Sequence, residues 1–524
     1  MLGASVLGLG VGLVACAGLL DIPERYYAGD AGIDAGIDDG LDAGGSVDVV
    51  STIPDSQPPI VPIDCRAGIK VRLLLDATGA TSGVSVPYFY GELDYLRELN
   101  VAGGIKGCPI QLEYADYGYD PAKAQLIYDG WKASPDWAKI VAIFGFGSGD
   151  TLQLAPHARE DKKPLISASY FGGLAAPDPV DINVSVPELS GAFDENSFPT
   201  HLTSDGFPYN FFTGTDYSTG IRIAMFHVKT LGGKRVGFFH CDQAYCAGPI
   251  PAGRTYAKAQ GLSLGRDLIV QLTEDQTAYD KKVHDYFVQE VEHAKQDGAY
   301  SPVDWIWMGN TTKTTAYLAK AIDNLKTRVR PPSTWGQTTD DAPDVQTLLA
   351  ALNVQIIVNN WGFDEMLFTL CGAACVNRVH GIVPFTAFGD TTRGSTEMPK
   401  VVALHDKWRA LDAKNADAGA AGDGGVPSYK NVRYVQGYVS AMAFRLAVER
   451  AIAAGGELTG PSLKSAFESF KQVDTGGLAD KLSYGVHDHR PQSTETIYKI
   501  AADGKLVPEP PSRTISLDDK WLGW

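Results

Sequence analysis

Short apolar runs rich in β-branched and aromatic residues alternate along the chain with longer stretches of amphipathic spacing. The short runs predict buried strands, at Ile69–Leu75, Ile110–Tyr114, Ile140–Phe144, Leu165–Ala168, Val236–Phe239, Leu268–Leu272, Trp305–Met308 and Val354–Val358. The longer stretches predict helices, at Val86–Asn100, Pro121–Lys132, Thr151–Asp161, Ser218–Leu231, Pro251–Gln260, Tyr279–Lys295 and Thr312–Lys326. Strands separated by helices imply right-handed crossovers and parallel sheets covered on both faces. One sheet cannot easily hold this many units, so the pattern predicts an α/β protein with two lobes.

The carboxyl-terminal part departs from this alternation. It adds a long predicted helix, Tyr434–Ala453, and two late strands, near Leu482 and at Thr496–Ile500. Residues 172–208 carry Gly, Pro and Asp where a short loop is expected, so they form an insertion. This insertion is either a lid or partner surface, or a loop without a role.

The charge of the chain is concentrated near its amino terminus. The sequence has 62 acidic and 45 basic residues, which gives a net charge of −17. Ten of the acids lie between Asp21 and Asp64, against the single base Arg25, so the other residues carry only −8. This mild excess argues against nucleic acid or an anionic lipid surface as the main partner. With 44% hydrophobic residues, the chain has ample material for buried cores.

The first 15 residues are small and apolar, and Cys16 follows Leu13-Val14-Ala15 at their end. A short apolar stretch followed by small residues is typical of a signal peptide. A cysteine after Leu-Val-Ala resembles the lipobox of bacterial lipoproteins, which implies acylation of Cys16 and a lipid anchor in a bacterial membrane. We therefore expect an exported lipoprotein, periplasmic or at the cell surface. The alternative is a free cysteine in an uncleaved apolar segment.

Residues 16–66 have the composition of a tether. Asp, Gly and small residues repeat from Asp30 to Gly45, and a proline-rich piece follows from Ile53 to Pro62. Glycine gives flexibility, the carboxylates repel one another and the prolines extend the chain, so a disordered linker is predicted. A calcium-binding loop is the alternative, but the alternating carboxylates and terminal Glu of such loops are missing.

Six cysteines remain if Cys16 is acylated, namely Cys65, Cys108, Cys241, Cys246, Cys371 and Cys375. An even number in an exported protein suggests disulfides, although about fifteen pairings are possible for six cysteines. Proximity favours Cys241–Cys246 and Cys371–Cys375, which leaves Cys65 with Cys108. Zinc is the alternative, but the sequence has no CxxC pair and no HExxH motif, so we expect no metal and no cofactor.

Several ordered stretches of the sequence resemble one protein family. They are Val101-Ala-Gly-Gly-Ile-Lys-Gly-Cys-Pro-Ile110, Asp116, Tyr119-Asp-Pro-Ala-Lys-Ala124, Phe144-Gly-Phe-Gly-Ser-Gly-Asp150, Pro164-Leu-Ile-Ser-Ala-Ser169, Ala244-Tyr245 and the helix from Tyr434. In this order and spacing they resemble the type I periplasmic binding proteins. The most similar branch is the leucine-binding-protein-like solute receptors of branched-chain amino acid and amide ABC transporters. The resemblance covers residues 67–505.

The resemblance implies two doubly wound, Rossmann-like lobes joined by three hinge crossovers, with a small solute in the cleft between them. It places residues 67–216 and 385–478 in the first lobe and residues 217–384 and 479–505 in the second, followed by a tail, 506–524. It further implies a receptor without catalytic activity that delivers an amino acid, amide or related solute to an ABC permease and ATPase in the membrane. We expect a monomer.

Residues that directly follow predicted strands are the candidate site, because ligands in open α/β sheets bind at the carboxyl ends of strands. Ser148 and Gly149 lie in a glycine-rich turn before a helix, where a hydroxyl and free backbone N–H groups can bind a carboxylate. The resemblance also places the carboxylate of the solute here. Asp150 is expected either to cap the helix or to repel a carboxylate. Three further candidates, or alternatively packing residues, follow the next strand: Ser169, Tyr170 and Phe171.

The second lobe offers Tyr245, Thr311 and Gln337 as candidates. By resemblance, Tyr245 closes over the solute; its alternative role is to brace the disulfide loop around it. Thr311 follows a predicted strand, and Gln337 lies at a turn where relatives that bind α-amino acids place an acidic residue. An unpaired buried ammonium group is costly, so a plain α-amino acid is a poor candidate solute. Trp361 and Phe363 either shape the cleft or fill a core, and we predict that they are core residues.

Two motifs suggest catalytic or metal chemistry instead. Gly261-Leu-Ser-Leu-Gly265 matches the G-x-S-x-G pattern of hydrolases, but that motif requires a strand-to-helix turn, and here a helix precedes and a strand follows. His487-Asp-His489 lacks a third ligand and is predicted to be a solvated turn. The alternative function is a sensory receptor without a transporter, and an exported hydrolase is a weaker alternative.

Overall fold

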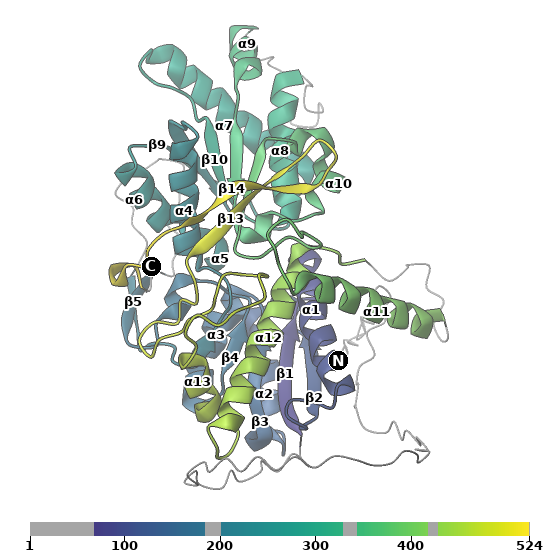
Figure 1. The fold of residues 1–524 in the computed structure, drawn as a ribbon. Helices are drawn as coiled ribbons and strands as arrows, with labels where there is room; N and C mark the ends of the chain where they lie inside the picture. The colour runs from purple at the N-terminus through teal and green to yellow at the C-terminus, as the bar shows by residue number, and fades with distance from the viewer. Residues whose placement is uncertain (1–67, 184–200, 328–342, 418–427, 523–524) are drawn as a thin grey trace, which may run out of the picture.

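The computed structural model describes residues 68–183, 201–327, 343–417 and 428–522. Two α/β lobes lie one above the other, each built on its own sheet (Figure 1). The predicted fold class, with two doubly wound lobes of parallel strands, is confirmed. The signal peptide, Cys16, the linker, Cys65 and Gln337 lie outside the described residues.

The first sheet has the strand order β2-β1-β3-β4-β7, with all neighbours parallel. Its strands are β1 (Ile69–Leu75), β2 (Ile110–Asp116), β3 (Ile140–Gly145), β4 (Leu165–Ser167) and β7 (Asn210–Phe211). Its first three connecting helices are α1 (Ser82–Val101), α2 (Pro121–Lys132) and α3 (Ser148–Asp161). Strands such as β1 and β3 are buried on both faces, which explains their continuous apolar runs.

The second sheet has the order β14-β13-β12-β11-β10-β8-β9. Its strands are β8 (Arg235–His240), β9 (Ser263–Ile269), β10 (Trp305–Gly309), β11 (Gln355–Val358), β12 (Val379–Val383), β13 (Thr494–Ile500) and β14 (Leu506–Thr514). Its helices are α4 (Tyr217–Thr230), α5 (Ala244–Ala247), α6 (Ile250–Ala259), α7 (Gln276–Gln296), α8 (Thr312–Thr327), α9 (Pro343–Ala351) and α10 (Leu367–Cys371). The strands from β9 to β12 are parallel, whereas β13 and β14 are antiparallel.

Three predictions about strands were wrong. The strand predicted at Leu268–Leu272 is β9, which begins already at Ser263. Residues 506–524, predicted as a tail, contain β14, which pairs with β13. Both are edge strands, where solvent-facing polar residues and prolines are tolerated and the apolar pattern is weak. Leu482 makes only a single bridge, to Val473.

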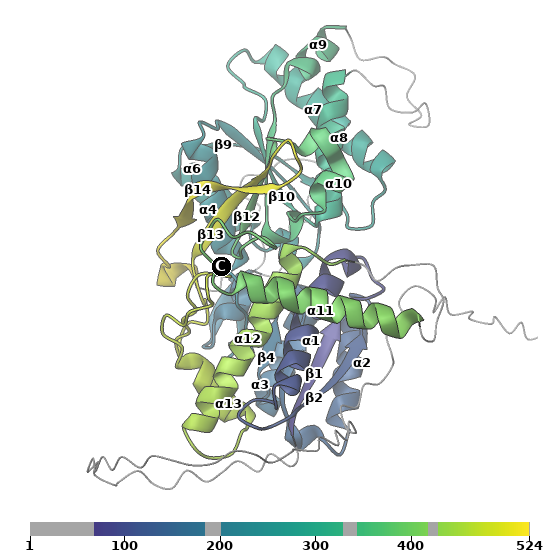
Figure 2. The same ribbon diagram turned by 45° about the vertical axis from the view of Figure 1, so that its right-hand side comes forward.

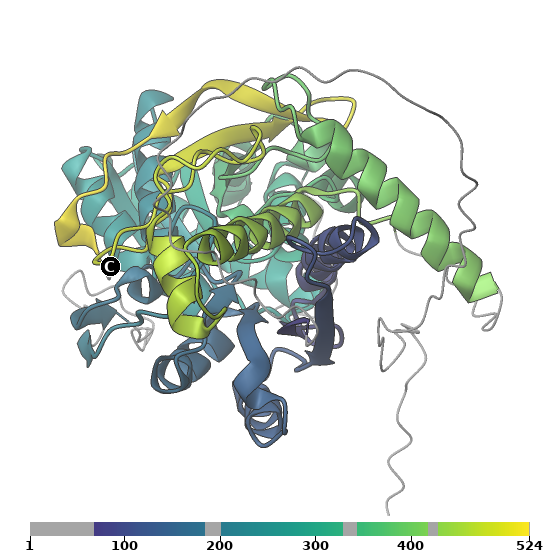
Figure 3. The same ribbon diagram turned by 60° about the horizontal axis from the view of Figure 1, so that its bottom comes forward.

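The chain passes between the lobes three times. After β12 it returns to the first lobe as α11 (Met398–Asp417), α12 (Val432–Ala453) and α13 (Gly460–Glu468), and it then enters the second lobe again as β13 and β14. Helix α12 lies along α1 in the first lobe (Figure 2), whereas α11 projects sideways from it (Figure 3). Since α12 closes a lobe that began at β1, contacts between distant segments hold this lobe together.

The insertion at 172–208 contains a short 3-10 turn, Gly172–Ala175, and an antiparallel pair of strands, β5 (Val180–Asn183) and β6 (His201–Ser204). None of the helices in the described part of the chain combines the length and apolar character of a bilayer-spanning segment.

The disulfides Cys241–Cys246 and Cys371–Cys375 are confirmed, with Cα–Cα distances of 5.3 and 5.8 Å. Cys108 is also disulfide-bonded, and its partner lies outside the described residues. The Cys241–Cys246 bond closes a small loop around Tyr245, after the end of β8.

Candidate functional site

A small cavity of about 20 Å³ lies where the two lobes meet. Residues from both lobes line it, namely Thr81, Val84, Tyr119, Phe146, Gly147, Ser148, Tyr217, Tyr245, Thr311 and Trp361. Most of them come just after the carboxyl end of a parallel strand: β2, β3, β8, β10 or β11. The cavity therefore lies at the edge where open α/β sheets bind their ligands.

Helix α3 points its amino terminus at this cavity. It begins at Ser148, three residues before the predicted start, so the Ser148 side chain belongs to the first helical turn. The Ser148 and Ser169 hydroxyl oxygens are 2.7 Å apart and both side chains are buried. The first N–H groups of a helix lack intrahelical acceptors and carry the positive end of its dipole. This end of α3 can therefore receive a carboxylate or an amide oxygen.

Gly147 allows this close approach. A Cβ atom there would lie 2.4 Å from Asp150 Oδ1, 2.6 Å from the Tyr119 ring and 2.8 Å from the Tyr117 hydroxyl. The Tyr117 hydroxyl also accepts a hydrogen bond from the Gly147 N–H, at 3.2 Å. Gly147 thus leaves room for three side chains beside the cavity, and Tyr119 among them lines it.

Three tyrosines, Tyr119, Tyr217 and Tyr245, line the cavity from different parts of the chain. Tyr217 accepts a hydrogen bond from Trp361 Nε1 at 2.7 Å. The Tyr245 hydroxyl is buried and has no hydrogen-bond partner among the described residues. Burial raises the pKa of Tyr217 to about 12 and raises the pKa values of Tyr119 and Tyr245 well above their usual value. All three hydroxyls therefore stay protonated at neutral pH and can donate to a solute.

Trp361 belongs to the hydrophobic core, as predicted, and its ring also forms one wall of the cavity. The ring stacks on Tyr170 with centroids 6.0 Å apart and meets Phe146 edge-on at 5.5 Å. Trp361 is only 4% exposed, so its sequence environment is that of a core residue. Phe363 is buried against Gly381, as the core prediction requires.

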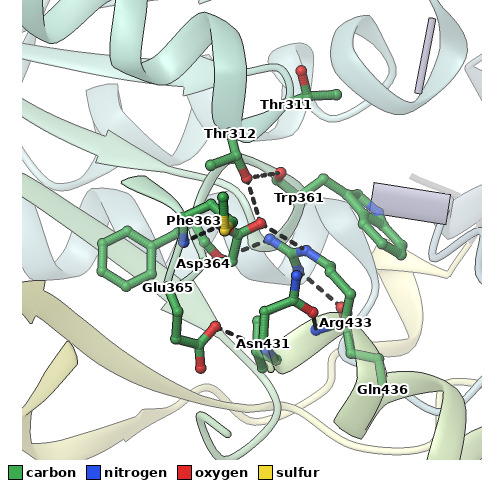
Figure 4. Close-up of polar contacts among 12 residues, drawn as sticks. Thr311, Thr312, Trp361, Phe363, Asp364, Glu365, Asn431, Arg433 and Gln436 are labelled. Atoms are coloured by element: carbon green, nitrogen blue, oxygen red, sulfur yellow. Dashed lines mark hydrogen bonds and ion pairs between the residues drawn. The ribbon is translucent and has the colours of Figure 1, made fainter. Parts of the chain in front are cut away.

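Arg433 holds the segment that carries Trp361 (Figure 4). This fully buried residue of α12 donates from Nη2 to the Phe363 carbonyl at 2.6 Å, and its Nε lies 3.6 Å from Asp364 Oδ2. Its guanidinium also lies 5.1 Å from the centre of the Trp361 ring. Thr312, at the start of α8, donates to the same Asp364 oxygen at 2.7 Å. Residues of both lobes are thus joined through one buried ion pair beside the cavity.

Glu365 adds a second connection between the lobes. Its two oxygens accept the N–H groups of Val432, at the start of α12, and of Phe388, each at 2.8 Å. Burial and the neighbouring Asp364 raise the pKa of Glu365 to about 7. The segment Trp361–Glu365 therefore connects the wall of the cavity to the helix that closes the first lobe.

The predicted site residues fall into two groups. Ser148, Tyr245 and Thr311 line the cavity. Ser169 lies behind Ser148, and the Phe171 ring lies so close to Gly248 that a Cβ there would be 2.4 Å away. Gly149 lies near Pro121 rather than in the lining, and Gln337 is outside the described residues. Tyr170 lies behind Trp361.

Sequence reasoning missed Thr81, Val84, Tyr119, Phe146 and Tyr217. The positions of the three aromatic residues in the sequence could have indicated them. Tyr119 and Phe146 follow β2 and β3, and Tyr217 lies where the chain crosses between the lobes. Thr81 and Val84 lie at the start of α1, after β1. The carboxyl-end rule applied to every strand would have found most of this set.

Asp150 lies in the first turn of α3, as a capping role requires, and does not line the cavity. Its carboxylate is buried and accepts a hydrogen bond from the Tyr117 hydroxyl at 2.9 Å. Burial raises the pKa of Asp150 to about 7, from an ordinary 3.8. An acid with a raised pKa binds its proton more tightly in the folded state. The contribution of the Asp150 carboxyl group to the free energy of unfolding is therefore complete below pH 3.8. It is lost as the pH rises to about 7.

We expect Asp150→Asn to flatten the pH dependence of stability. Between pH 5 and pH 8 the wild-type protein should lose about 2 kcal/mol more free energy of unfolding than the variant, since one pKa unit corresponds to about 1.4 kcal/mol. Urea unfolding at both pH values measures this difference. Asp129→Asn, at an exposed position of α2, is the control; equal slopes in wild type and Asp150→Asn would contradict the assignment.

The structure also describes the two motifs that suggest catalytic or metal chemistry, Gly261–Gly265 and His487–His489. Ser263 begins β9 after a turn at Gly261, so it does not occupy the strand-to-helix turn of hydrolases. His487 is exposed and contacts Asp178 Oδ2 at 2.6 Å, as a solvated turn requires. His489 is instead buried, with its ring nitrogens near the Asn210 carbonyl and Glu468. The prediction of a solvated turn was therefore wrong for His489.

The chain is similar to known proteins in sequence and in fold. Residues 68–328 match the model of a family described as periplasmic binding protein. No curated protein matches the chain.

Several solved structures have a similar fold. An ABC transporter substrate-binding protein from Aeropyrum pernix is 23% identical, with 87% of this chain and 98% of that chain covered and a TM-score of 0.63. A fatty acid ABC transporter substrate-binding protein from Thermomonospora curvata is 18% identical, with 87% and 95% covered and a TM-score of 0.62. A branched-chain amino acid ABC transporter protein from Thermus thermophilus with bound valine is 17% identical, with 87% and 98% covered and a TM-score of 0.61. With its two lobes, three crossings and matching family model, this chain belongs to the type I periplasmic binding protein family.

Proposed function

We propose that this protein is the extracytoplasmic solute-binding component of an ABC importer. The observation that carries the proposal is the cavity between the lobes, which joins the amino terminus of α3 to hydroxyl and aromatic side chains. The first lobe supplies Ser148 and Phe146, and the second supplies Tyr245 and Trp361. A solute that contacts both sets stabilises the closed arrangement of the lobes, which is the form recognised by a permease.

The chemistry of the lining favours a small amide or carboxylate with an apolar body. The end of α3 and the tyrosine hydroxyls donate to oxygen atoms, and the aromatic rings cover apolar groups. None of the described residues that line the cavity is charged, so a free ammonium group finds no ion pair among them. The neighbours named for valine and for a fatty acid indicate that this fold receives solutes of different size. An amino acid derivative or amide matches the chemistry of this lining best.

The proposal includes a lipid anchor that attaches the protein to the membrane. Acylation of Cys16 would hold the protein at the membrane surface, with residues 16–66 as the tether. Confinement near the membrane raises the effective concentration of the loaded protein at its permease. Mass spectrometry of the mature protein, showing a diacylated or triacylated amino-terminal cysteine, tests this part.

We expect a thermal-shift screen of amides, ureas, amino acids and aromatic acids to identify the solute. At 100 times its Kd, a solute that binds only the folded state adds about 2.7 kcal/mol to the free energy of unfolding. Ser148→Ala and Tyr245→Phe should lose most of this stabilisation, because each removes a hydroxyl donor from the cavity. Their melting temperatures without solute should stay close to that of the wild type.

Tyr256→Phe, in helix α6 outside the lining, is the matched control and should respond as the wild type does. An unchanged response in both cavity variants would show that the solute binds elsewhere. Release of a chemically altered solute after incubation would contradict a pure binding function.

A further inference from the structure

Three side chains with metal-ligating atoms meet in the second lobe, away from the cavity. They are His227 on α4, His380 on β12 and Glu509 on β14, and their ligand atoms all lie within 4.8 Å of one another. The residues come from three distant parts of the sequence, so no short sequence motif indicates that they form a metal site. The register of the sheet fixes two of them, since His380 pairs with Lys499 on β13 and Glu509 pairs with Ile497 on the same strand.

The distances within this group suit one shared ion. His380 Nδ1 lies 2.9 Å and His227 Nε2 lies 3.5 Å from the same oxygen, Glu509 Oε2. Zinc bonds of about 2.0–2.2 Å place neighbouring ligand atoms of a tetrahedron about 3.3 Å apart. Both nitrogen–oxygen distances are near this value, and the two nitrogens lie within 4.8 Å of each other.

His227 is a buried side chain whose polar atoms are otherwise unused. It is 3% exposed, and beyond the approach to Glu509 neither ring nitrogen has a hydrogen-bond partner among the described residues. Buried polar groups in proteins are almost always satisfied. The orientation of this ring toward Glu509 and His380 therefore points to a missing ligand.

The surroundings hold the group in place. The second carboxylate oxygen, Glu509 Oε1, lies 3.4 Å from Lys499 Nζ, which leaves Oε2 for the histidines. Carboxylate ligands commonly have such an outer partner. Arg513, the other nearby cation, is occupied by the Thr230 hydroxyl and by the face of Phe226. The His380 ring lies 5.1 Å from the Trp305 ring, which restricts its motion.

We propose that His227, His380 and Glu509 bind a divalent transition-metal ion, with zinc the best match. Two imidazoles and one carboxylate are a donor set found in zinc sites with three protein ligands, where water takes the open position. The bound ion connects helix α4 to the edge strand β14 and so fixes the carboxyl-terminal hairpin on the second lobe. The proposal is independent of the solute and of transport.

The test uses the full-length protein without a histidine tag, treated with chelator and then titrated with Zn²⁺ by calorimetry. We expect about one equivalent to bind with a Kd in the micromolar range or below, and Zn²⁺ to raise the melting temperature. His227→Gln, His380→Gln and Glu509→Gln should each weaken binding at least tenfold and remove the shift. His487→Gln, at an exposed histidine that contacts Asp178, is the matched control and should bind as the wild type does.

Co²⁺ provides a readout that does not depend on the variants. In the wild-type protein it should give the strong visible absorption of a four-coordinate site, and Zn²⁺ should displace it. Wild-type protein that binds no Zn²⁺ below 1 mM would overturn the proposal. Folded variants that bind Zn²⁺ as tightly as the wild type would do the same, because the metal would then lie elsewhere.

Discussion

Replacing Arg433 with methionine is expected to lower the free energy of unfolding by about 3–5 kcal/mol, the usual effect of removing one partner of a buried ion pair. Arg433 is fully buried, and Asp364 is 2% exposed. Without the guanidinium, the buried Asp364 carboxylate loses the cation beside it and the Phe363 carbonyl loses its donor. Trp361 also loses the cation that lies over its ring. The melting temperature of the folded variant should therefore rise only weakly when a solute is added.

Guanidinium unfolding and the thermal shift with solute measure the two effects. Lys407→Met is the matched control, because the Lys407–Glu98 pair is about 40% exposed on each side and surface pairs contribute little. A second substitution, Asp364→Asn, should recover part of the stability lost in Arg433→Met, since it removes the unpaired charge. Additive losses in the double variant would rule out direct coupling of the two residues.

Replacing Gly437 with alanine is expected to destabilise the protein by about 3 kcal/mol through overpacking where α12 crosses α1. A Cβ at this position would lie 1.9 Å from the Tyr88 carbonyl oxygen and 3.0 Å from the Glu92 nitrogen. The opposing glycine, Gly91, is as tightly placed, with a Cβ position 2.1 Å from the Tyr434 carbonyl oxygen. Backbone atoms cannot rotate away as a side chain can, so the two helices have to separate.

Gly130→Ala is the control for this experiment. Gly130 lies in α2, and no atom lies within 4 Å of a Cβ added there. This substitution should stabilise the protein by up to about 1 kcal/mol, because alanine is the better helix former. Thermal and urea unfolding of both variants give the comparison. Equal stability of Gly437→Ala and wild type would mean that the two helices are not in contact in solution.

Local pattern was sufficient for most elements of the first lobe. Strand β1 and helix α2 have the predicted limits, because β1 is a continuous apolar run and α2 has clear start signals. Asp120 accepts the N–H of Ala122 and Pro121 occupies the first turn, both of which favour helix initiation at this point. Edge strand β9 was misplaced and edge strand β14 was predicted as a tail, since one edge of each is unpaired and the apolar pattern is weak.

The candidate site was predicted less completely than the fold. Ser148, Tyr245 and Thr311 were found because each follows a strand and carries a polar group, and all three line the cavity. Trp361 was assigned to the core because a buried tryptophan has the same sequence signature in a core and in a cavity wall. Which of the two it forms depends on how the lobes meet.

The sequence by itself determined the alternation of strands and helices, the two lobes and the two short disulfide loops, because these depend on residues close together in the chain. Only the tertiary structure decided which side chains share a cavity, which helices touch, and that His227, His380 and Glu509 meet. Many of these contacts, such as those of Trp361 with Tyr217 and of His227 with His380, join residues more than a hundred positions apart. Their existence depends on strand order and on the packing of one lobe against the other, which no local pattern of hydrophobic and polar residues encodes.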